Sequence, residues 1–219
     1  MRLFLDSANL EEIARAWSMG VISGVTTNPS LLRKEGARDF RGHVRRICEL
    51  VEGDVSVEVL SQEFEGMVEE ALGLVEIHPS RVVVKIPMTE EGLKATKLLS
   101  SKGIKVNVTL VFSPAQALLA ALAGARYVSP FVGRMEDAGF DGLSLVGQTL
   151  EVLLGSGLRC EVIAASIRNV RQLIEVARMG CHVATVPFGV ISSSVSHHLT
   201  SSGLERFKRD WEELMREHV

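Results

Sequence analysis

The sequence predicts a closed, parallel (β/α)8 barrel, the TIM-barrel architecture, with an additional amphipathic helix at its C-terminus. Short β-branched or apolar runs alternate with longer amphipathic segments along the whole chain, at spacings of roughly 20–30 residues. The length of 219 residues lies in the usual range for one such barrel. An open doubly wound sheet is the main alternative. Eight regular units favour closure, and no G-x-G-x-x-G motif follows the first run.

Eight strands are expected from runs rich in valine, isoleucine and threonine, and segments of helical period separate them. The strands are residues 2–6, 24–27, 56–60, 81–87, 105–110, 127–131, 161–165 and 182–186. The helical segments are residues 10–19, 40–51, 66–76, 89–101, 115–123, 143–154 and 169–178. In the second helical segment Val44, Ile47, Cys48 and Val51 repeat at helical spacing between charged residues, which indicates one buried face.

Cap residues mark where the expected helices begin and end. Asn9, Thr89 and Ser113 precede helical segments and can accept a hydrogen bond from the first turn. Glycines fall where four of the helices should end: Gly20, Gly103, Gly124 and Gly180.

One amphipathic segment follows the eighth unit. Residues 202–219 are expected to form a helix, with the apolar side chains of Leu204, Phe207, Trp211, Leu214 and Met215 on one face. Two placements remain open for it, on its own barrel or on a neighbouring subunit. Residues 192–194 and the pair His197 and His198 are interpreted as a polar loop, and a metal site there is not favoured.

Composition indicates one globular domain, residues 1–219, without a nucleic-acid or membrane partner. Hydrophobic residues make up 46% of the chain and charged residues 23%, and the net charge of −3 is spread along the sequence. The three cysteines, Cys48, Cys160 and Cys181, are far apart and indicate neither disulfides nor zinc. Residues 106–128 are too interrupted by polar residues for a membrane span, and the first residues lack a signal-peptide pattern. A soluble, cytoplasmic protein is expected.

Lys85 is the most informative single residue, because it lies within the apolar run of residues 82–87. Buried lysines are rare, and burial disfavours the ammonium form. A neutral amine can attack a carbonyl carbon and form a Schiff base. The alternative is a lysine on an edge strand whose ammonium reaches water.

Other polar residues recur at the ends of the expected strands, where barrel enzymes hold their active sites. They are Asp6, Thr26, Thr27, Asn28, Glu58, Asn107, Thr109, Ser129, Arg134, Ser166 and Arg168. Each alone could be a turn residue, a satisfied core group or a surface charge. Together they are better explained by a shared site, because burying a lysine and two carboxylates without mutual use would cost several kcal/mol.

The expected site divides into two halves. Asp6 and Glu58 can move protons around the amine of Lys85. On the other side Ser166 and Arg168 are expected to open a helix after the seventh strand, a favourable position for a phosphate, with Arg134 as a second clamp. An amine opposite a phosphate cradle indicates a phosphosugar that carries a carbonyl group.

These segments resemble the transaldolases, specifically the short subfamily that also includes fructose-6-phosphate aldolases. The resemblance covers essentially the whole chain and rests on FLDSAN (4–9), GVTTNPS (24–30), VKIP (84–87), NVTLVFS (107–113), YVSPFVGR (127–134), AASIR (164–168) and ERFKRDW (205–211). It implies a (β/α)8 barrel, sugar phosphates as substrates, no cofactor, and decamers built from two pentameric rings in which the terminal helix reaches a neighbour.

The resemblance also implies a role for each matching residue. Lys85 would be the Schiff-base lysine and Asp6 the acid/base at the hydroxyl beside the cleaved bond, while Glu58 and a water held by Thr109 would assist dehydration. The dihydroxyacetone fragment would be oriented by Asn28, Asn107 and Ser129, and the phosphate bound by Arg134, Ser166 and Arg168.

Two residues favour a transferase over a lyase within this subfamily. Aldolases tend to carry glutamine in place of Glu58 and tyrosine in place of Phe131. A tyrosine hydroxyl near the imine can help to protonate the enamine and release the ketone, whereas phenylalanine cannot. Two alternatives remain. The first is a lyase that releases free dihydroxyacetone, and the second is a phosphosugar-binding barrel without turnover.

Overall fold

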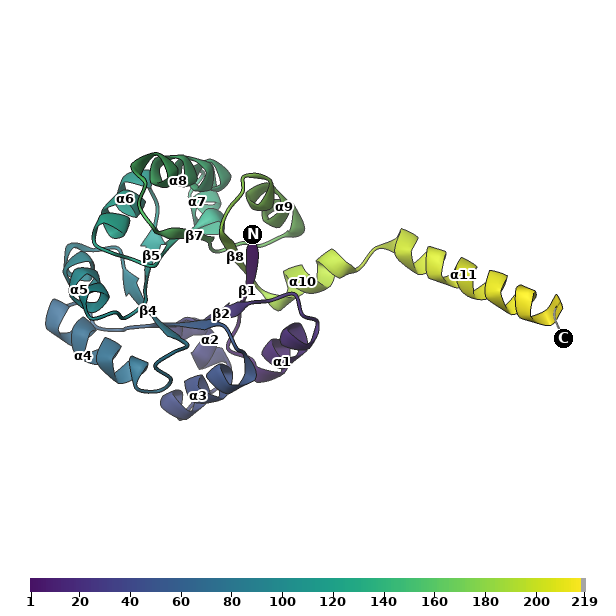
Figure 1. Ribbon diagram of the computed structural model, residues 1–219, viewed down its shortest axis with the longest axis horizontal. Coiled ribbons are helices and arrows are strands. Elements are labelled where there is room, and N and C mark those ends of the chain that lie inside the picture. Colours follow the sequence, from purple (N-terminus) through teal and green to yellow (C-terminus); the bar gives the residue numbers. More distant parts are fainter. Residues whose placement is uncertain (218–219) are drawn as a thin grey trace.

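The structure, a computed structural model, describes residues 1–217 and contains a closed barrel of eight parallel strands (Figure 1). The strands follow one another around the barrel in chain order, and β8 closes it by pairing with β1. This confirms the predicted fold class. The strands are β1 Arg2–Asp6, β2 Gly24–Thr26, β3 Asp54–Glu58, β4 Val82–Pro87, β5 Val106–Val111, β6 Tyr127–Pro130, β7 Glu161–Ala164 and β8 Val183–Val186.

Eleven helices lie in the described part of the chain, most of them in a ring outside the strands (Figure 1). They are α1 Leu10–Ser18, α2 Pro29–Lys34, α3 Phe40–Leu50, α4 Phe64–Val75, α5 Glu90–Ser101, α6 Pro114–Leu122, α7 Val132–Asp137, α8 Gly142–Ser156, α9 Val170–Arg178, α10 Phe188–Val195 and α11 His198–Glu217. The side chains of Asn9, Thr89 and Ser113 cap α1, α5 and α6 as expected. The four expected terminal glycines all have a positive φ.

The polar-loop interpretation before the terminal helix is wrong. Residues 192–194 belong to α10, and His198 is the first residue of α11. Val190 and Ile191 in α10 are buried against the barrel, and this packing outweighs the polar run that follows them.

The register of the strands places several candidate residues opposite one another. Glu58 on β3 lies opposite Lys85 on β4, and Lys85 lies opposite Asn107 on β5. Asp6 on β1 lies opposite Thr26 on β2. Because β4 pairs with strands on both sides, the alternative of an edge-strand lysine is excluded.

The barrel interior below these residues is apolar and closed at its floor by charge pairs. Val83 precedes Lys85 by two residues and packs in a buried cluster with Phe4, Tyr127, Ile163 and Val183. At the amino-terminal ends of the strands, the Tyr127 hydroxyl donates to Asp54 at 2.7 Å, and Lys105 pairs with the same carboxylate at 2.5 Å. Substrate can therefore approach Lys85 from the carboxyl ends of the strands.

The terminal helix α11 projects away from the barrel (Figure 1). Leu204, Phe207 and Trp211 on this helix are 61–65% exposed. The last two residues of the expected helix, 218 and 219, lie outside the described residues. Within residues 1–217, no helix combines the length and apolar character needed to cross a membrane.

Candidate active site

A cavity of about 120 Å³ opens at the carboxyl ends of the strands. Its lining includes every residue expected in the site except Thr27, Glu58 and Arg168. The lining residues are Asp6, Thr26, Asn28, Lys85, Asn107, Thr109, Ser129, Phe131, Arg134, Ala165, Ser166 and Thr185.

Lys85 is buried at the base of this cavity, with 6% of its surface exposed. Its Nζ lies 3.1 Å from Oε2 of Glu58 and donates a hydrogen bond of 3.0 Å to the carbonyl oxygen of Thr27. The Glu58 side chain is 17% exposed, so the pair is shielded from bulk water. A buried amine held beside a carboxylate can pass a proton to it and become nucleophilic.

Asp6 is partly open to the cavity and otherwise enclosed by protein. Burial raises the pKa of its carboxyl group, and the negative charge of Glu58 acts in the same direction. The positive charge of Lys85 and a hydrogen bond of 2.8 Å from the Thr26 hydroxyl partly oppose this shift. Asp6 can therefore take up a proton more readily than an ordinary aspartate, which suits a general base.

Amide and hydroxyl groups line the wall on the β5 and β6 side. The Ser129 hydroxyl donates to Oδ1 of Asn107 at 2.7 Å, which fixes the orientation of that amide. The hydroxyl of Thr109 is buried and has no hydrogen-bond partner among the described protein atoms. Buried polar groups are normally paired, so this oxygen is suited to a bound water or a substrate hydroxyl. Asn28 uses its side-chain oxygen to cap α2 at Leu31, which leaves its amide N–H groups available.

Arg134 and Ser166 lie at the opposite rim. The Arg134 guanidinium lies 5.2 Å from the centre of the Phe131 ring, a cation–π contact that orients it. Ser166 has a left-handed backbone with φ of 58°, a conformation that non-glycine residues seldom adopt. The N–H of Gly133 donates to the Ser166 carbonyl at 3.0 Å, and a Cβ on Gly133 would come within 2.4 Å of that oxygen. The loops after β6 and β7 are thus packed closely together.

Arg168 is not brought into the cavity. Its guanidinium forms a two-pronged ion pair with Asp137 at the end of α7, and its side chain is 48% exposed. The expected helical segment 169–178 is confirmed, because α9 begins at Val170 with Asn169 as its cap, but Ser166 and Arg168 precede this helix and do not open it. The backbone N–H of Arg168 donates to the Gln172 side chain and is therefore already paired.

The sequence-based prediction missed Thr185 on β8, which lines the cavity and contacts the Thr26 hydroxyl at 2.5 Å. For Thr26, the sequence predicts a position at the end of a strand but no contact with Asp6. The available signal was a threonine inside the run Val183–Val186, but threonine is also a common strand former.

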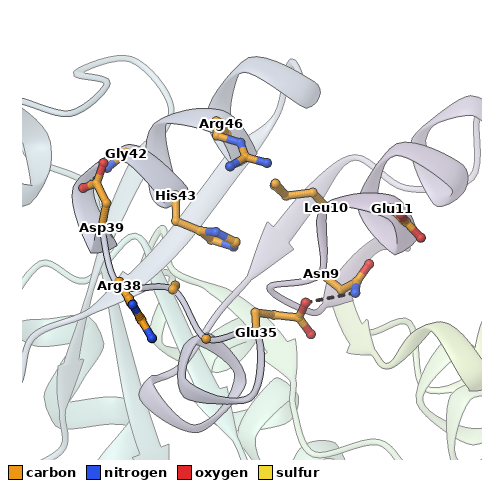
Figure 2. Close-up of a pocket in the computed structure, with 11 residues that line it drawn as sticks. Asn9, Leu10, Glu11, Glu35, Arg38, Asp39, Gly42, His43 and Arg46 are labelled. Carbon is orange, nitrogen blue, oxygen red and sulfur yellow. Dashed lines mark hydrogen bonds between the residues drawn. The ribbon is translucent and has the colours of Figure 1, made fainter.

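A second hollow, of about 490 Å³, lies between the starts of α1 and α3 and the loop after α2 (Figure 2). Figure 2 shows the imidazole of His43 directed into this hollow and the amide of Asn9 bound to Glu35, a contact of 2.9 Å. His43 binds the Ala8 carbonyl at 2.7 Å. This hollow has a larger volume than the cavity at the barrel mouth, but no lysine lines it, and its polar groups mainly hold neighbouring loops. The buried lysine and the carboxylate of Asp6 therefore favour the smaller cavity as the active site.

A (β/α)8 barrel whose mouth holds a buried lysine beside two carboxylates has the features of an enzyme that acts on carbonyl compounds through an amine. Residues 3–218 match the family described as Transaldolase/Fructose-6-phosphate aldolase. The chain belongs to this family.

Curated relatives align with almost the full chain. A probable transaldolase of Caldicellulosiruptor saccharolyticus is 54% identical over 98% of both chains. One of Clostridioides difficile is 54% identical over 97% of both chains, and one of Methanococcus maripaludis is 52% identical over 97% of this chain and 98% of that protein. Among solved structures, a thiamine phosphate pyrophosphorylase of Pyrococcus furiosus superposes with a TM-score of 0.60 at 16% identity and covers 85% of each chain. At that identity the likeness shows the barrel fold alone.

Proposed function

We propose that the protein is a transaldolase of the pentose phosphate pathway. It transfers a dihydroxyacetone unit from a ketose phosphate, sedoheptulose 7-phosphate or fructose 6-phosphate, to an aldose phosphate, glyceraldehyde 3-phosphate or erythrose 4-phosphate. The observation that carries the proposal is the buried amine of Lys85, 3.1 Å from Glu58 at the base of the cavity. Family membership and the names of the relatives support the same reaction.

The first half-reaction begins at the neutral amine of Lys85, which attacks C2 of the ketose. Glu58 takes the ammonium proton beforehand, and a water at Thr109 passes protons as the carbinolamine loses water to form an iminium. Asp6 then removes the proton of the C4 hydroxyl. The C3–C4 bond breaks, its electron pair moves into the iminium to give an enamine, and an aldose phosphate leaves.

The second half-reaction reverses these steps with a new acceptor. C3 of the enamine attacks the aldehyde carbon of the incoming aldose phosphate, and Asp6 returns its proton to the new C4 oxygen. Water then hydrolyses the iminium and frees Lys85. Since the iminium accepts the electron pair and the resulting enamine holds it between the two halves, no cofactor enters the scheme.

Substrate binding is assigned to the polar cavity walls. Asn107 and Ser129, already joined to each other, orient the hydroxyl groups of the three-carbon fragment together with Asn28. Arg134 and Ser166 bind the phosphate at the rim. Arg168 can join them only after it leaves Asp137.

Reduction with borohydride in the presence of fructose 6-phosphate tests the Schiff base. Wild-type protein is expected to gain a three-carbon adduct, which peptide mass spectrometry should locate on Lys85. The Lys85→Ala variant should gain none and should not transfer the unit. An active Lys85→Ala protein would refute the scheme.

The lyase alternative is tested by measuring dihydroxyacetone with and without erythrose 4-phosphate. Phe131 supports the transferase, because its ring has no hydroxyl to protonate the enamine. It packs edge-to-face with Phe112 at a centroid distance of 5.8 Å, which screens the rim from water. A transferase should release little dihydroxyacetone without acceptor, whereas a lyase releases it steadily.

We further propose that the protein acts in the cytoplasm as a homo-oligomer, a pentamer or decamer. The exposed apolar side chains of Leu204, Phe207 and Trp211 on α11 support association with a second copy. Sedimentation of the purified protein would measure the oligomer, and a monomer at micromolar concentration would refute it. The three cysteines are free and buried, as expected of a protein in a reducing compartment.

A further inference from the structure

Two threonine hydroxyls, from the strands on either side of β1, form a hydrogen-bonded chain that ends at Asp6. Thr26 on β2 donates to Oδ1 of Asp6 at 2.8 Å, and the hydroxyl oxygens of Thr26 and Thr185 lie 2.5 Å apart. β1 pairs with β2 on one side and with β8 on the other. Thr26 and Thr185 are only 3% and 4% exposed, yet both line the cavity. The two hydroxyls therefore form a short chain behind the carboxylate.

The count of protons fixes the direction of this chain. An ionised carboxylate only accepts hydrogen bonds, and each threonine hydroxyl has one proton to donate. While Asp6 is ionised, Thr26 must give its proton to Asp6, so Thr185 must donate to Thr26. Once Oδ1 of Asp6 carries a proton, Asp6 can donate to Thr26, and Thr26 can then donate to Thr185. The chain has two orientations, and the protonation of Asp6 selects between them.

We propose that Thr26 and Thr185 are positioning residues that act as one unit, holding the Asp6 carboxylate toward the substrate and reversing their hydrogen bonds when it accepts the C4 hydroxyl proton. The inference deepens the proposed transaldolase function and rests on it. Neither hydroxyl forms or breaks a covalent bond, and no group beyond Asp6 and the substrate exchanges a proton.

The charged surroundings of Asp6 make such support necessary. Lys85 on β4 is its positive neighbour, but that charge is shared with Glu58 on β3, which repels the Asp6 carboxylate. Among residues 1–217, two side chains lower the pKa of Asp6: Lys85 through its charge and Thr26 through its hydrogen bond. The Thr26 hydroxyl accepts a hydrogen bond from Thr185, so its own proton is directed to Asp6. This contact keeps the Asp6 carboxylate in one rotamer.

Five variants test the unit. Thr26→Val, Thr185→Val and the double variant that combines them remove hydroxyls at nearly constant shape, Thr185→Ser keeps the hydroxyl, and Thr96→Val is the matched control. Thr96 is a buried threonine of α5 whose hydroxyl binds Gly92 at 2.7 Å, outside the site. The measurements are kcat and kcat/KM for transfer from fructose 6-phosphate to erythrose 4-phosphate across pH, and trapping with borohydride. If Thr185→Val does not fold, Thr185→Cys replaces it, since a thiol is a weak donor.

We expect Thr26→Val to lower kcat about 10- to 100-fold and Thr185→Val about 2- to 10-fold, the ranges for hydrogen bonds to charged and to neutral partners. The double variant should fall no further than Thr26→Val, because one unit is being removed twice. The acidic limb of the pH profile should move to higher pH, since a contact that lowers the pKa of Asp6 is lost. Thr185→Ser should recover most of the rate, and all variants should still be trapped on Lys85.

Two results would overturn the inference alone. One is a Thr185→Val protein that matches Thr96→Val in rate and pH profile. The other is a double variant whose loss in kcat equals the combined losses of Thr26→Val and Thr185→Val. Wild-type protein that gives no trapped adduct would overturn the proposed function and this inference with it. The trapping result therefore separates the two failures.

Discussion

Replacing Lys85 by methionine should destabilise the protein by an amount that depends strongly on pH. Methionine has similar length and no charge, so the change leaves Glu58 without its partner at 3.1 Å. At that separation and an effective dielectric constant of about 20, the lost attraction is about 5 kcal/mol. Breaking a buried pair by removing one partner costs about 3–5 kcal/mol in other proteins.

The pH dependence of this loss follows from Asp6. Burial raises the pKa of the Asp6 carboxyl group and the positive charge of Lys85 opposes that shift, so removing Lys85 raises this pKa further. A carboxyl group with a raised pKa stabilises the folded state less as pH rises, so the loss must be larger at neutral pH than in acid. We expect Lys85→Met to lose about 3–5 kcal/mol near pH 7.5 and clearly less near pH 5.

Urea unfolding followed by circular dichroism at both pH values measures the difference from wild type. The double variant Lys85→Met/Glu58→Gln is the control, because it removes both charges and should recover most of the stability near pH 7.5. The reasoning fails if Lys85→Met is as stable as wild type near pH 7.5. It also fails if its loss is the same at both pH values, or if the double variant recovers nothing.

Three further outcomes are expected. Asp6→Asn should abolish transfer and raise thermal stability near neutral pH. Burial raises the pKa of Asp6, so the stability that this carboxyl group contributes is complete below about pH 3.9 and is lost as pH rises through the raised pKa. The gain in stability over wild type must therefore vanish in acid. Arg134→Ala should raise the KM for phosphorylated donors about 10- to 100-fold, whereas Arg168→Ala should raise it less because Arg168 is held by Asp137; steady-state kinetics would contradict this if the order were reversed. Asp54→Ala should lower the free energy of unfolding by about 1–3 kcal/mol and leave kcat unchanged, since it removes an acceptor of Tyr127 at the barrel floor; a changed kcat would be contrary.

Apolar runs and helical periods were sufficient to predict the barrel, because strands such as β4, β6 and β8 are almost fully buried and barrel helices such as α3 and α9 bury one face. The pattern failed for short elements. α2 and α7 have six residues each, too few to show a helical period, and β3 begins at Asp54, two residues earlier than expected. The carboxylate of Asp54 pairs with Lys105, the residue before β5, a partner distant in sequence that a local pattern does not reveal.

Position at a strand end predicted most of the cavity lining, because the carboxyl ends of all eight parallel strands meet at one rim of the barrel. Side-chain direction could not be predicted in the same way. Arg168 follows β7 as expected but turns to Asp137, which a local pattern does not reveal. Thr185 lies in a strand of valine and alanine, and threonine is β-branched like valine, so the sequence gives no reason to assign its hydroxyl a role in the site.

The projection of α11 from the barrel has a practical consequence for engineering. Side chains that would join copies of the chain lie after residue 197, whereas those assigned to the chemistry lie between residues 6 and 185. The proposed assembly and the proposed substrate preference can thus be altered by substitutions in separate stretches of the chain. Substitutions at the barrel mouth leave α11 as it is, and substitutions in α11 leave the barrel mouth as it is.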